Sequence, residues 1–360
     1  MTNYNYPDLS NVRRVLVIKL RHHGDVLLTS PVFSVLKNRL PQSEIFAYIY
    51  KETLPILDGH PAIKGFHLYD RKWKSLSFWQ RVIEETRLIR EIRNQRYDLI
   101  INLTEGDRGT YVALLSKAAF RVGVHPELMG KYKRKIFTHL VKHCRNPRHT
   151  VEQNLDALRR IGIFPSYQER NLCFHIPEDV RRTILKYLEE AGLQERAYIL
   201  IHPASRWLFK CWPGDKVAEL MQRLNAQGYP LVMSSSPDSK ELSMTEEILM
   251  RCPGISLLNL SGKLSLKELG ALIHSCACLI CVDSLPVHIA SALNTPVAAI
   301  FGPSSEDAWG PWKNPGGCVI AENISCRPCN LDGCGGSKVC DCLEQLPVDR
   351  VLSVIKRIMN

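Results

Sequence analysis

The chain has 360 residues, of which 45% are apolar and 23% charged, values typical of a globular protein long enough for two domains. No run of about 18 apolar residues occurs, which excludes a membrane-spanning helix, and the first residues, MTNYNYPDLSNVRR, lack the apolar core of a signal peptide. The net charge of +11 is uneven, because residues 1–150 carry 26 Lys and Arg against 13 Asp and Glu, whereas residues 151–360 carry 21 against 23. We therefore expect a cytoplasmic protein whose N-terminal half either meets an anionic partner (nucleic acid, acidic membrane or phosphorylated substrate) or has an idle basic surface.

Short apolar runs alternate with helical patterns through the first half of the chain. Strands are predicted over residues 13–20, 44–50, 65–69, 97–103 and 120–124. Helices are predicted over residues 32–40 and 78–96, the second with many i,i+4 charge pairs. Strands separated by helices in this way are typical of βαβ units in a parallel sheet.

The second half repeats this alternation after a proline-containing linker over residues 165–180. Strands are predicted over residues 198–201, 229–235, 255–260, 278–282 and 297–301. Helices are predicted over residues 217–228, 240–250, 266–275, 285–293 and, at the end of the chain, 348–359. The fold class is therefore α/β, with two Rossmann-like domains. No strand is followed by GxGxxG or a P-loop, which weighs against an NAD- or FAD-dependent enzyme.

The segment RHHGDVLLTSPV, residues 21–32, joins the first predicted strand to a helix. In a simple connection Gly24 allows a tight turn and Asp25 caps the helix. Ligands of open α/β sheets, however, bind beyond the carboxyl ends of the strands. Asp25 is therefore either a helix cap or a catalytic base.

Three further segments follow strands of the second half. In HPASRWLFKCWP, residues 202–213, Ser205 and Lys210 are suited to phosphate, although an ordinary loop with two cations explains this segment more simply. In DSLPVH, Asp283 and Ser284 are natural N-cap residues of a helix whose N-terminus attracts anions. His288, one turn later, points back at a pyrophosphate or packs in the core. Gly302 permits close approach of the backbone to a ligand.

Together these motifs resemble the lipopolysaccharide heptosyltransferases of glycosyltransferase family 9. The resemblance rests on VRRVLVIKLRHHGDVLLTSPV, YILIHPASRWLFKCWP, LICVDSLPVHIASALNTPVAAIFGPS and the CRPC segment at residues 326–329, which span nearly the whole chain. The HGD, KCWP and DS-P-H forms are most similar to the subfamily that adds a branching heptose to the inner core. One position departs from the family pattern, because Leu285 stands where members usually have glycine.

The resemblance implies a GT-B fold, with two Rossmann-like domains facing each other across a cleft. It implies an acceptor domain over residues 1–175, a nucleotide-sugar donor domain over residues 176–346 and a C-terminal helix over residues 347–360. For that helix, the N-terminal domain is the expected packing partner.

The implied reaction is an inverting, metal-independent transfer of heptose from ADP-L-glycero-D-manno-heptose to a lipopolysaccharide core acceptor, Kdo2-lipid A bearing heptose. Asp25 matches the catalytic base, and Arg21, His22 and His23 are expected near the acceptor. The expected donor-binding residues are Ser205, Lys210, Glu241, Asp283, Ser284, His288 and Gly302. No cofactor or metal is expected. The enzyme is expected at the cytoplasmic face of the inner membrane, bound peripherally because no exposed apolar surface for insertion is evident.

Alternatives remain at the level of the sequence. Another core heptosyltransferase (I or II) or a family 9 enzyme with a different sugar donor would share these motifs. A basic nucleic-acid-binding protein is the alternative from another class, but no RNA- or DNA-binding motif occurs, so no nucleic acid partner is expected. The cysteines at 326, 329, 334, 340 and 342 form either a metal site, as the C-x2-C spacing allows, or a reduced loop.

Overall fold

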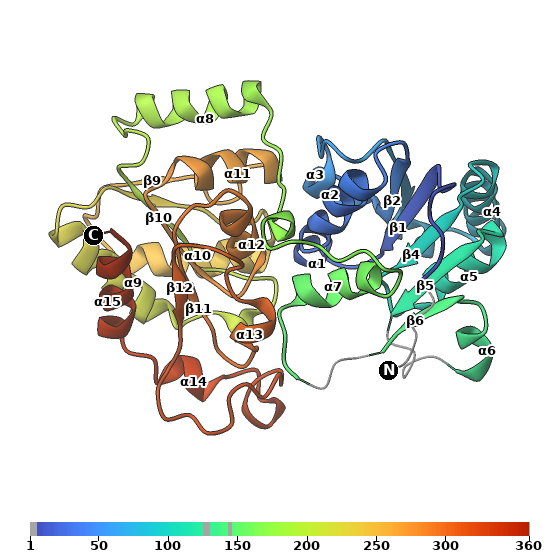
Figure 1. Cartoon of the computed structure of the whole chain (residues 1–360). Helices are drawn as coiled ribbons and strands as arrows, with labels where there is room; N and C mark the ends of the chain where they lie inside the picture. Colours follow the sequence, from blue (N-terminus) through green and yellow to red (C-terminus); the bar gives the residue numbers. More distant parts are fainter. Residues whose placement is uncertain (1–5, 125–129, 143–145, 360) are drawn as a thin grey trace. The chain divides into compact units, whose positions relative to one another are not determined.

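The computed structural model describes residues 6–124, 130–142 and 146–359, and the chain divides into two compact units, Met1–His175 and Ile176–Asn360 (Figure 1). The division falls within residues 165–180, where the sequence predicts the linker. Each unit contains one six-stranded sheet in which all strand pairs are parallel. Among the described residues, no helix is long and apolar enough to cross a bilayer.

The sheet of the first unit has the strand order β3-β2-β1-β4-β5-β6. Its strands are β1 (Arg14–Lys19), β2 (Glu44–Tyr50), β3 (Gly65–Tyr69), β4 (Leu99–Asn102), β5 (Phe120–Val124) and β6 (His139–Val141). Its helices are α1 (His23–Leu27), α2 (Ser30–Arg39), α3 (Leu54–Leu57), α4 (Phe78–Asn94), α5 (Asp107–Ser116), α6 (Lys131–Arg134) and α7 (Thr150–Arg159). Helices α2 and α7 pack together on one side of the sheet, and α4 and α5 on the other (Figure 1).

The sheet of the second unit has the order β9-β8-β7-β10-β11-β12, the same pattern as the first. Its strands are β7 (Ile199–His202), β8 (Leu231–Met233), β9 (Leu257–Asn259), β10 (Cys278–Val282), β11 (Val297–Ile300) and β12 (Gly317–Val319). Its helices are α8 (Glu178–Glu190), α9 (Gly214–Ala226), α10 (Ser239–Met250), α11 (Leu266–Ser275), α12 (Leu285–Ala292), α13 (Glu306–Trp309), α14 (Asp341–Glu344) and α15 (Val348–Met359). Strands β7 and β10 are buried along their whole length, as expected for parallel strands covered on both faces.

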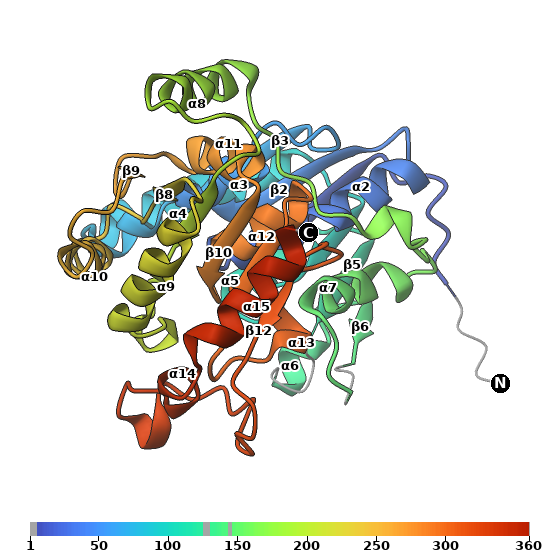
Figure 2. The ribbon, with the colours of Figure 1, turned by 90° about the vertical axis from the view of Figure 1, so that its left-hand side faces the viewer.

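The last helix, α15, belongs to the second unit. It packs against β10, β11, β12 and α9, and its residues Val351, Leu352 and Ile355 are buried in the core of that unit (Figure 2). The apolar stripe of this helix completes the cover of the second sheet. The expectation that the helix also packs back on the N-terminal domain stays a prediction.

Several elements were not predicted from the sequence, among them the strands β6 and β12 and the helices α5, α7 and α8. Strands β6 and β12 have only three residues each and lie at the sheet edges, where partial exposure leaves no continuous apolar run. Helix α8 is mostly charged and buries only Ile184 and Leu188.

Candidate functional site

Both sheets have a topological switch point beside their first strand. In the first unit it lies between β1 and β4, and in the second between β7 and β10, because successive strands are added on opposite sides of these pairs. Ligands of open α/β sheets bind beyond the carboxyl ends of the strands at such points. Asp25 follows β1, Ser205 and Lys210 follow β7, and Asp283 and Ser284 follow β10.

Asp25 lies in the first turn of α1 and is not its cap. The N-cap is His22, which makes no side-chain capping bond, and Gly24 lies inside the helix, so the turn needs no left-handed glycine. The Asp25 side chain is 14% exposed, and its Oδ1 lies 3.6 Å from Nε of Arg21. The helix-cap explanation for Asp25 is therefore wrong, and its carboxylate is left partly open to solvent at the end of β1.

The two histidines beside Asp25 differ in their surroundings. His22 is exposed, whereas Nε2 of His23 lies 2.9 Å from the carbonyl oxygen of Glu52. That contact ties α1 to the segment after β2. His23 thereby holds the turn in place, and His22 is the more accessible of the two.

A buried lysine lies below the Asp25 turn and was missed from the sequence. Lys19, the last residue of β1, donates to the carbonyl of Leu103 (3.1 Å) and to Oδ1 of Asn154 (3.3 Å). Burial lowers the pKa of Lys19, and the charges of Asp25 and Glu105 partly oppose this effect. The sequence signal for this residue was a lysine directly after the apolar run VLVI of the strand.

A cavity of about 700 Å³ opens at the carboxyl ends of β1–β4 in the first unit. It is lined by aromatic residues (Tyr48, Tyr50, Tyr69 and Tyr111), by charged residues (Arg21, Arg81, Glu85, Glu105, Asp107 and Arg108), by aliphatic residues (Leu20, Leu88, Ile89, Val112 and Leu115), and by Thr104 and Gly106. Aromatic faces beside planar polar groups suit a saccharide, which presents both C–H faces and hydroxyl groups. Arg21 belongs both to this cavity and to the Asp25 ion pair.

Four side chains in this cavity form one polar network, in which Arg81 Nε donates to Glu85 Oε1 at 3.1 Å. Arg108 donates to Tyr69 Oη at 2.9 Å and to Glu85 Oε1 at 3.1 Å, and its guanidinium lies 3.7 Å from the Tyr69 ring centroid. Tyr69 also donates to Glu85 at 3.2 Å. The sequence did not predict this network, because its members come from β3, α4 and α5. The polar run TEGDR after β4 was the available signal for Arg108.

In the second unit, Lys210 and Asp283 meet at the switch point. Lys210 Nζ lies 2.6 Å from Asp283 Oδ2, and the two side chains are 24% and 8% exposed. The lysine follows β7 and the aspartate follows β10, so the pair bridges two adjacent strand ends. Two residues predicted separately to bind the donor are thus brought together.

The loop that carries Lys210 is anchored by its neighbour Trp212. This indole is completely buried, and its Nε1 donates to the carbonyl of Leu346 at 3.2 Å. Cys340 adds a second link, because its thiol donates to the carbonyl of Phe209 at 3.0 Å. Both bonds join the loop to the segment before α15 and restrict where Lys210 can lie.

Helix α12 begins directly after Asp283, with Ser284 as its N-cap. The Ser284 hydroxyl donates back to the Val282 carbonyl at 3.1 Å and makes no capping bond, so Ser284 does not cap the helix by its side chain as the sequence predicts. His288, one turn later, is only 4% exposed. Burial on this scale fits the core position that the sequence left open for His288.

The other predicted donor residues lie around the same strand ends. Ser205 is buried, and its Oγ accepts from the amide of Trp207 at 3.3 Å. Glu241 is also buried, in the first turn of α10, where Oε2 accepts from the amide of Ser236 at 3.3 Å. Gly302 follows β11, and a Cβ atom there would lie 2.7 Å from the side chain of Leu343. Close packing against Leu343 therefore explains why a glycine stands at position 302.

The cysteine-rich segment contains thiols in different environments. Cys326 and Cys334 are exposed, whereas burial raises the pKa of the Cys340 thiol to about 12. The amide of Asp341 donates to Cys334 Sγ at 3.4 Å. Within the described ranges, no three His, Cys, Asp or Glu side chains are gathered as metal ligands, and all twelve described cysteines are free.

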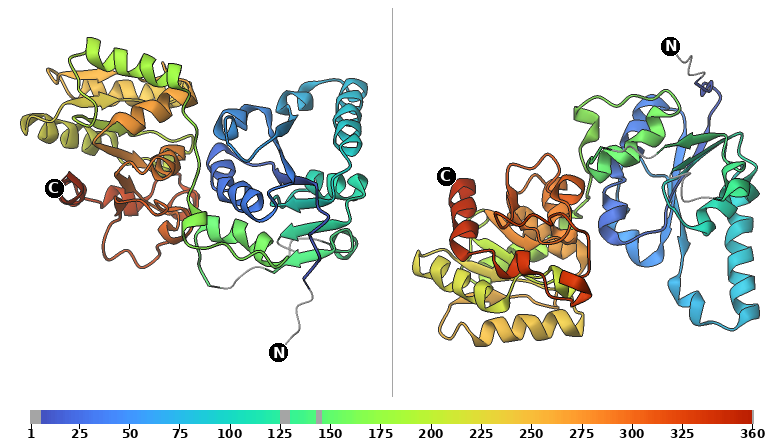
Figure 3. Two further views of the ribbon diagram at one scale, coloured as in Figure 1. Left: turned by 45° about the horizontal axis from the view of Figure 1, so that its top comes forward. Right: turned by 90° about the horizontal axis from the view of Figure 1, so that it is seen from below.

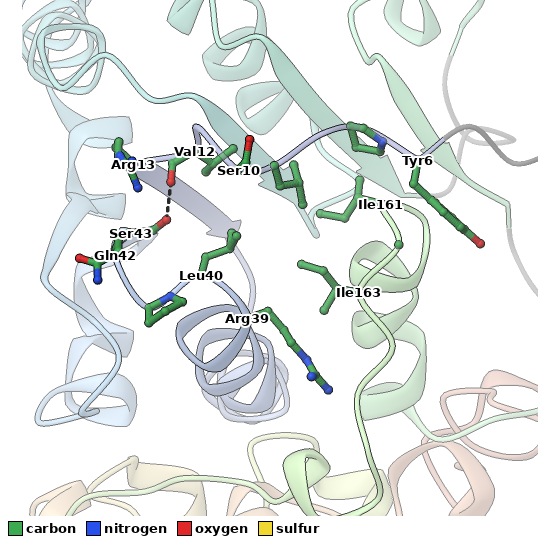
Figure 4. Close-up of a pocket in the computed structure, with 14 residues that line it drawn as sticks. Tyr6, Ser10, Val12, Arg13, Arg39, Leu40, Gln42, Ser43, Ile161 and Ile163 are labelled. Carbon is green, nitrogen blue, oxygen red and sulfur yellow. Dashed lines mark hydrogen bonds between the residues drawn. The ribbon is translucent and has the colours of Figure 1, made fainter.

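A second cavity, of about 420 Å³, lies at the opposite end of the first sheet (Figure 4). It is lined by residues at the start of β1 and β2, including Val12, Arg13 and Ser43, and by Ile161 and Ile163. The Ser43 hydroxyl donates to the Val12 carbonyl at 2.7 Å across it. This cavity lies at the amino ends of the strands, whereas the cavity of about 700 Å³ lies at their carboxyl ends, where ligands of open α/β sheets bind.

Comparisons with known proteins agree on one family. Residues 85–339 match glycosyltransferase family 9 (heptosyltransferase). Over 296 residues the chain is 34% identical to lipopolysaccharide heptosyltransferase 3 of Escherichia coli, covering 82% of this chain and 85% of the relative. The crystal structure of a family 9 glycosyl transferase from Veillonella parvula superposes with a TM-score of 0.83 at 23% identity, covering 99% of both chains. Escherichia coli WaaC, solved with ADP-2-deoxy-2-fluoro heptose, superposes with a TM-score of 0.73 at 17% identity, covering 96% of this chain and 99% of that one.

Proposed function

Because the chain belongs to glycosyltransferase family 9, as its resemblance predicted, and has the GT-B fold, we propose that it transfers heptose to the lipopolysaccharide inner core. The donor is ADP-L-glycero-D-manno-heptose and the product carries a branching heptose. The observation that carries this proposal is the 34% identity over most of both chains to a lipopolysaccharide heptosyltransferase 3. The ADP-heptose analogue bound by WaaC, which shares the fold, supports the donor.

In the proposed mechanism, Asp25 is the general base of an inverting displacement. The acceptor hydroxyl attacks the anomeric carbon from the face opposite ADP, its proton passes to the Asp25 carboxylate, and the bond to the diphosphate oxygen breaks. A partly open carboxylate at the end of β1 supports this role. Arg21 lines the cavity proposed for the acceptor, and its Nε lies 3.6 Å from Asp25 Oδ1. This position supports a role for Arg21 in orienting the Asp25 carboxylate toward the acceptor.

The donor diphosphate is proposed to bind at the Lys210–Asp283 pair. Negative charge grows on the leaving ADP in the transition state, and a fixed cation stabilises it there. The 2.6 Å contact positions Lys210, while the start of α12 at Ser284 supplies backbone N–H groups. Glu241, in the first turn of α10, is proposed as the ribose contact, and Ser205, His288 and Gly302 stay proposed as donor-site residues.

The acceptor is proposed to bind in the 700 Å³ cavity, with Arg21, His22 and His23 at its entrance. The cavity has the size and the aromatic and polar lining of a sugar site. Since the acceptor is lipid-linked, we propose that the enzyme works peripherally at the cytoplasmic face of the inner membrane.

We also propose that transfer needs no metal, because Lys210 and helix N–H groups provide the positive charge.

Incubation with ADP-heptose and core acceptors tests the function directly. We expect ADP release and a product heavier by one heptose when Kdo2-lipid A bearing heptose is the acceptor, at the same rate in excess EDTA. A product formed on an acceptor without heptose would instead assign the chain to another core heptosyltransferase. No product from any ADP-heptose reaction would contradict the proposal, and reversible loss in EDTA would contradict the metal-free mechanism.

A further inference from the structure

One side of the first unit exposes large apolar side chains in a group. Helix α4 and the residue pair before it contribute Leu76 (38% exposed), Phe78 (70%), Trp79 (73%), Val82 (40%) and Ile83 (63%). Single exposed apolar residues are ordinary, but contiguous ones mark interaction surfaces. The sequence showed no sign of this exposed apolar group, because the helical pattern of residues 78–96 does not show which of its faces is covered.

The arrangement of these residues on α4 is regular. Positions 78, 79, 82 and 83 follow the i, i+1, i+4, i+5 spacing that places side chains on one side of a helix. No residue of Phe78–Ile83 is buried, and the first buried position of the helix is Leu88. A capping box between Ser77 and Gln80 holds this exposed start in helical form. The apolar side is thus displayed on a fixed helix.

Helix α5 packs beside α4 (Figure 3), and its exposed side chains extend the apolar group. It adds Tyr111 (52% exposed), Leu114 (50%) and Leu115 (39%). We name these three, together with Leu76 and the four α4 residues, the α4–α5 face.

The charge around this face favours an anionic partner. Residues 71–94 contain seven Lys and Arg against three Glu, and both Lys72 and Lys74 are exposed next to Leu76. Exposed aromatic residues beside lysines are the composition that binds the headgroup region of acidic bilayers. A second copy of the same face would bring like charges together, which weakens self-association.

The same two helices also form the wall of the acceptor cavity. Arg81, Glu85 and Leu88 of α4 and Tyr111 and Leu115 of α5 line it, and the last two residues also belong to the α4–α5 face. The apolar face and the cavity are therefore continuous. A saccharide attached to a lipid reaches such a cavity while its lipid stays in a bilayer beneath the face.

We propose that the α4–α5 face docks on an anionic lipid bilayer, with Phe78 and Trp79 inserted into the headgroup region. The proposal rests on the proposed function, because it names the surface through which a lipid-linked acceptor is reached. It places the attachment on two helices of the first unit, where aromatic insertion and the charges of Lys72 and Lys74 act together.

Flotation with vesicles tests this surface without using activity. We expect the full chain to bind vesicles of phosphatidylglycerol and phosphatidylethanolamine but not vesicles of phosphatidylcholine alone. Phe78→Ser/Trp79→Ser should weaken this binding about tenfold or more, since two inserted aromatic side chains are lost. A control pair in the second unit, Tyr187→Ser/Met250→Ser, removes comparably exposed side chains (46% and 74%) and should bind as the wild type does.

Transfer to a water-soluble core oligosaccharide, cleaved from its lipid, separates the two proposals. The Phe78→Ser/Trp79→Ser chain should keep wild-type transfer there, because neither side chain lines the cavity. No transfer by the wild type would contradict the proposed function alone. Failure of the wild type to float, equal flotation of both double variants, or a dimer in light scattering that the Phe78/Trp79 changes abolish would each overturn the membrane docking.

Discussion

Two ion pairs lie at the carboxyl ends of central strands, one in each unit, and they differ in how tightly they hold. Lys210 and Asp283 are 2.6 Å apart and largely buried, whereas Arg21 and Asp25 are 3.6 Å apart and Arg21 is 48% exposed. A tight pair fixes a cation in place. The longer contact leaves the Asp25 carboxylate partly open to solvent, and the two arrangements support the two proposed roles.

Replacement of Asp25, the proposed base, tests the Arg21–Asp25 pair. We expect Asp25→Asn to lower kcat by about 10²-fold or more, because an amide cannot take the acceptor proton. Binding of ADP, measured by calorimetry, should be unchanged. Asp58→Asn, which alters an exposed carboxylate of the same unit, is the matched control. Near-normal turnover in a folded Asp25→Asn enzyme would remove Asp25 from the base role.

Removal of the Lys210 cation tests the Lys210–Asp283 pair. We expect Lys210→Ala to weaken ADP binding by about tenfold or more, since the phosphate loses a cation and then faces the buried Asp283 carboxylate alone. Calorimetric titration with ADP measures this. Lys263→Ala, at an exposed lysine of the same unit, should bind ADP normally. Equal affinities for all three proteins would show that Lys210 has no contact with phosphate.

A buried histidine in the first unit makes stability depend on pH. Burial lowers the pKa of His60 to about 4 from its usual 6.5, so the unfolded chain binds more protons between these values. The free energy of unfolding contributed by neutral His60 is complete above pH 6.5 and is lost as the pH falls toward 4. His60→Gln should therefore reduce the fall in Tm between pH 7.5 and pH 5. An unchanged fall would show that His60 titrates normally in the folded chain.

At the scale of elements, the sequence predicted strands and site residues best where a continuous apolar run is followed by polar residues. Strands β1, β7 and β10 were predicted because their cores are continuous apolar runs, and the polar residues after them located Asp25, Lys210 and Asp283. The cavity proposed for the acceptor could not be predicted, because Tyr69, Glu85 and Arg108 converge only through the order of the sheet. Local pattern identifies a strand end, but tertiary packing decides which strand ends meet.

Helix α15 provides a prediction at this scale. Truncation after Pro347 should destabilise the second unit, because the helix buries Val351, Leu352 and Ile355 against its sheet. We expect a Tm lower by several degrees and greater proteolysis of residues beyond 176 than of the first unit. Val351→Ala alone should produce a smaller effect of the same kind. Wild-type stability of the truncated chain would contradict this packing role.

At the scale of the whole molecule, the charge asymmetry predicts how salt acts on each substrate. The first 150 residues carry a net charge of +13 and the remainder −2. Attraction of a phosphorylated acceptor by this field is screened over about 8 Å at physiological ionic strength. The acceptor KM should therefore rise with salt more steeply than the Kd of ADP.

The segment KYKRK, residues 131–135, is a basic run of the first unit, and two of its exposed lysines test where this attraction acts. The double variant Lys131→Gln/Lys135→Gln should flatten the salt dependence of the acceptor KM and leave ADP binding unchanged. Lys133 is kept in this variant because it forms an ion pair with Asp107. Steady-state kinetics from 50 to 300 mM salt, over which the Debye length falls about 2.5-fold, measures both slopes. Equal acceptor slopes in the two proteins would exclude these lysines from acceptor capture.

The central place of β1 has a consequence for synthesis on the ribosome. The strand made first pairs with β2 and β4, so the sheet grows outward on both sides as the chain emerges. Its buried Lys19 reaches Asn154, and the amide of Cys173 donates to Ser30 at 2.9 Å. The first unit therefore cannot complete its core until the linker has left the exit tunnel, after which it folds ahead of the second unit while that half is still being translated.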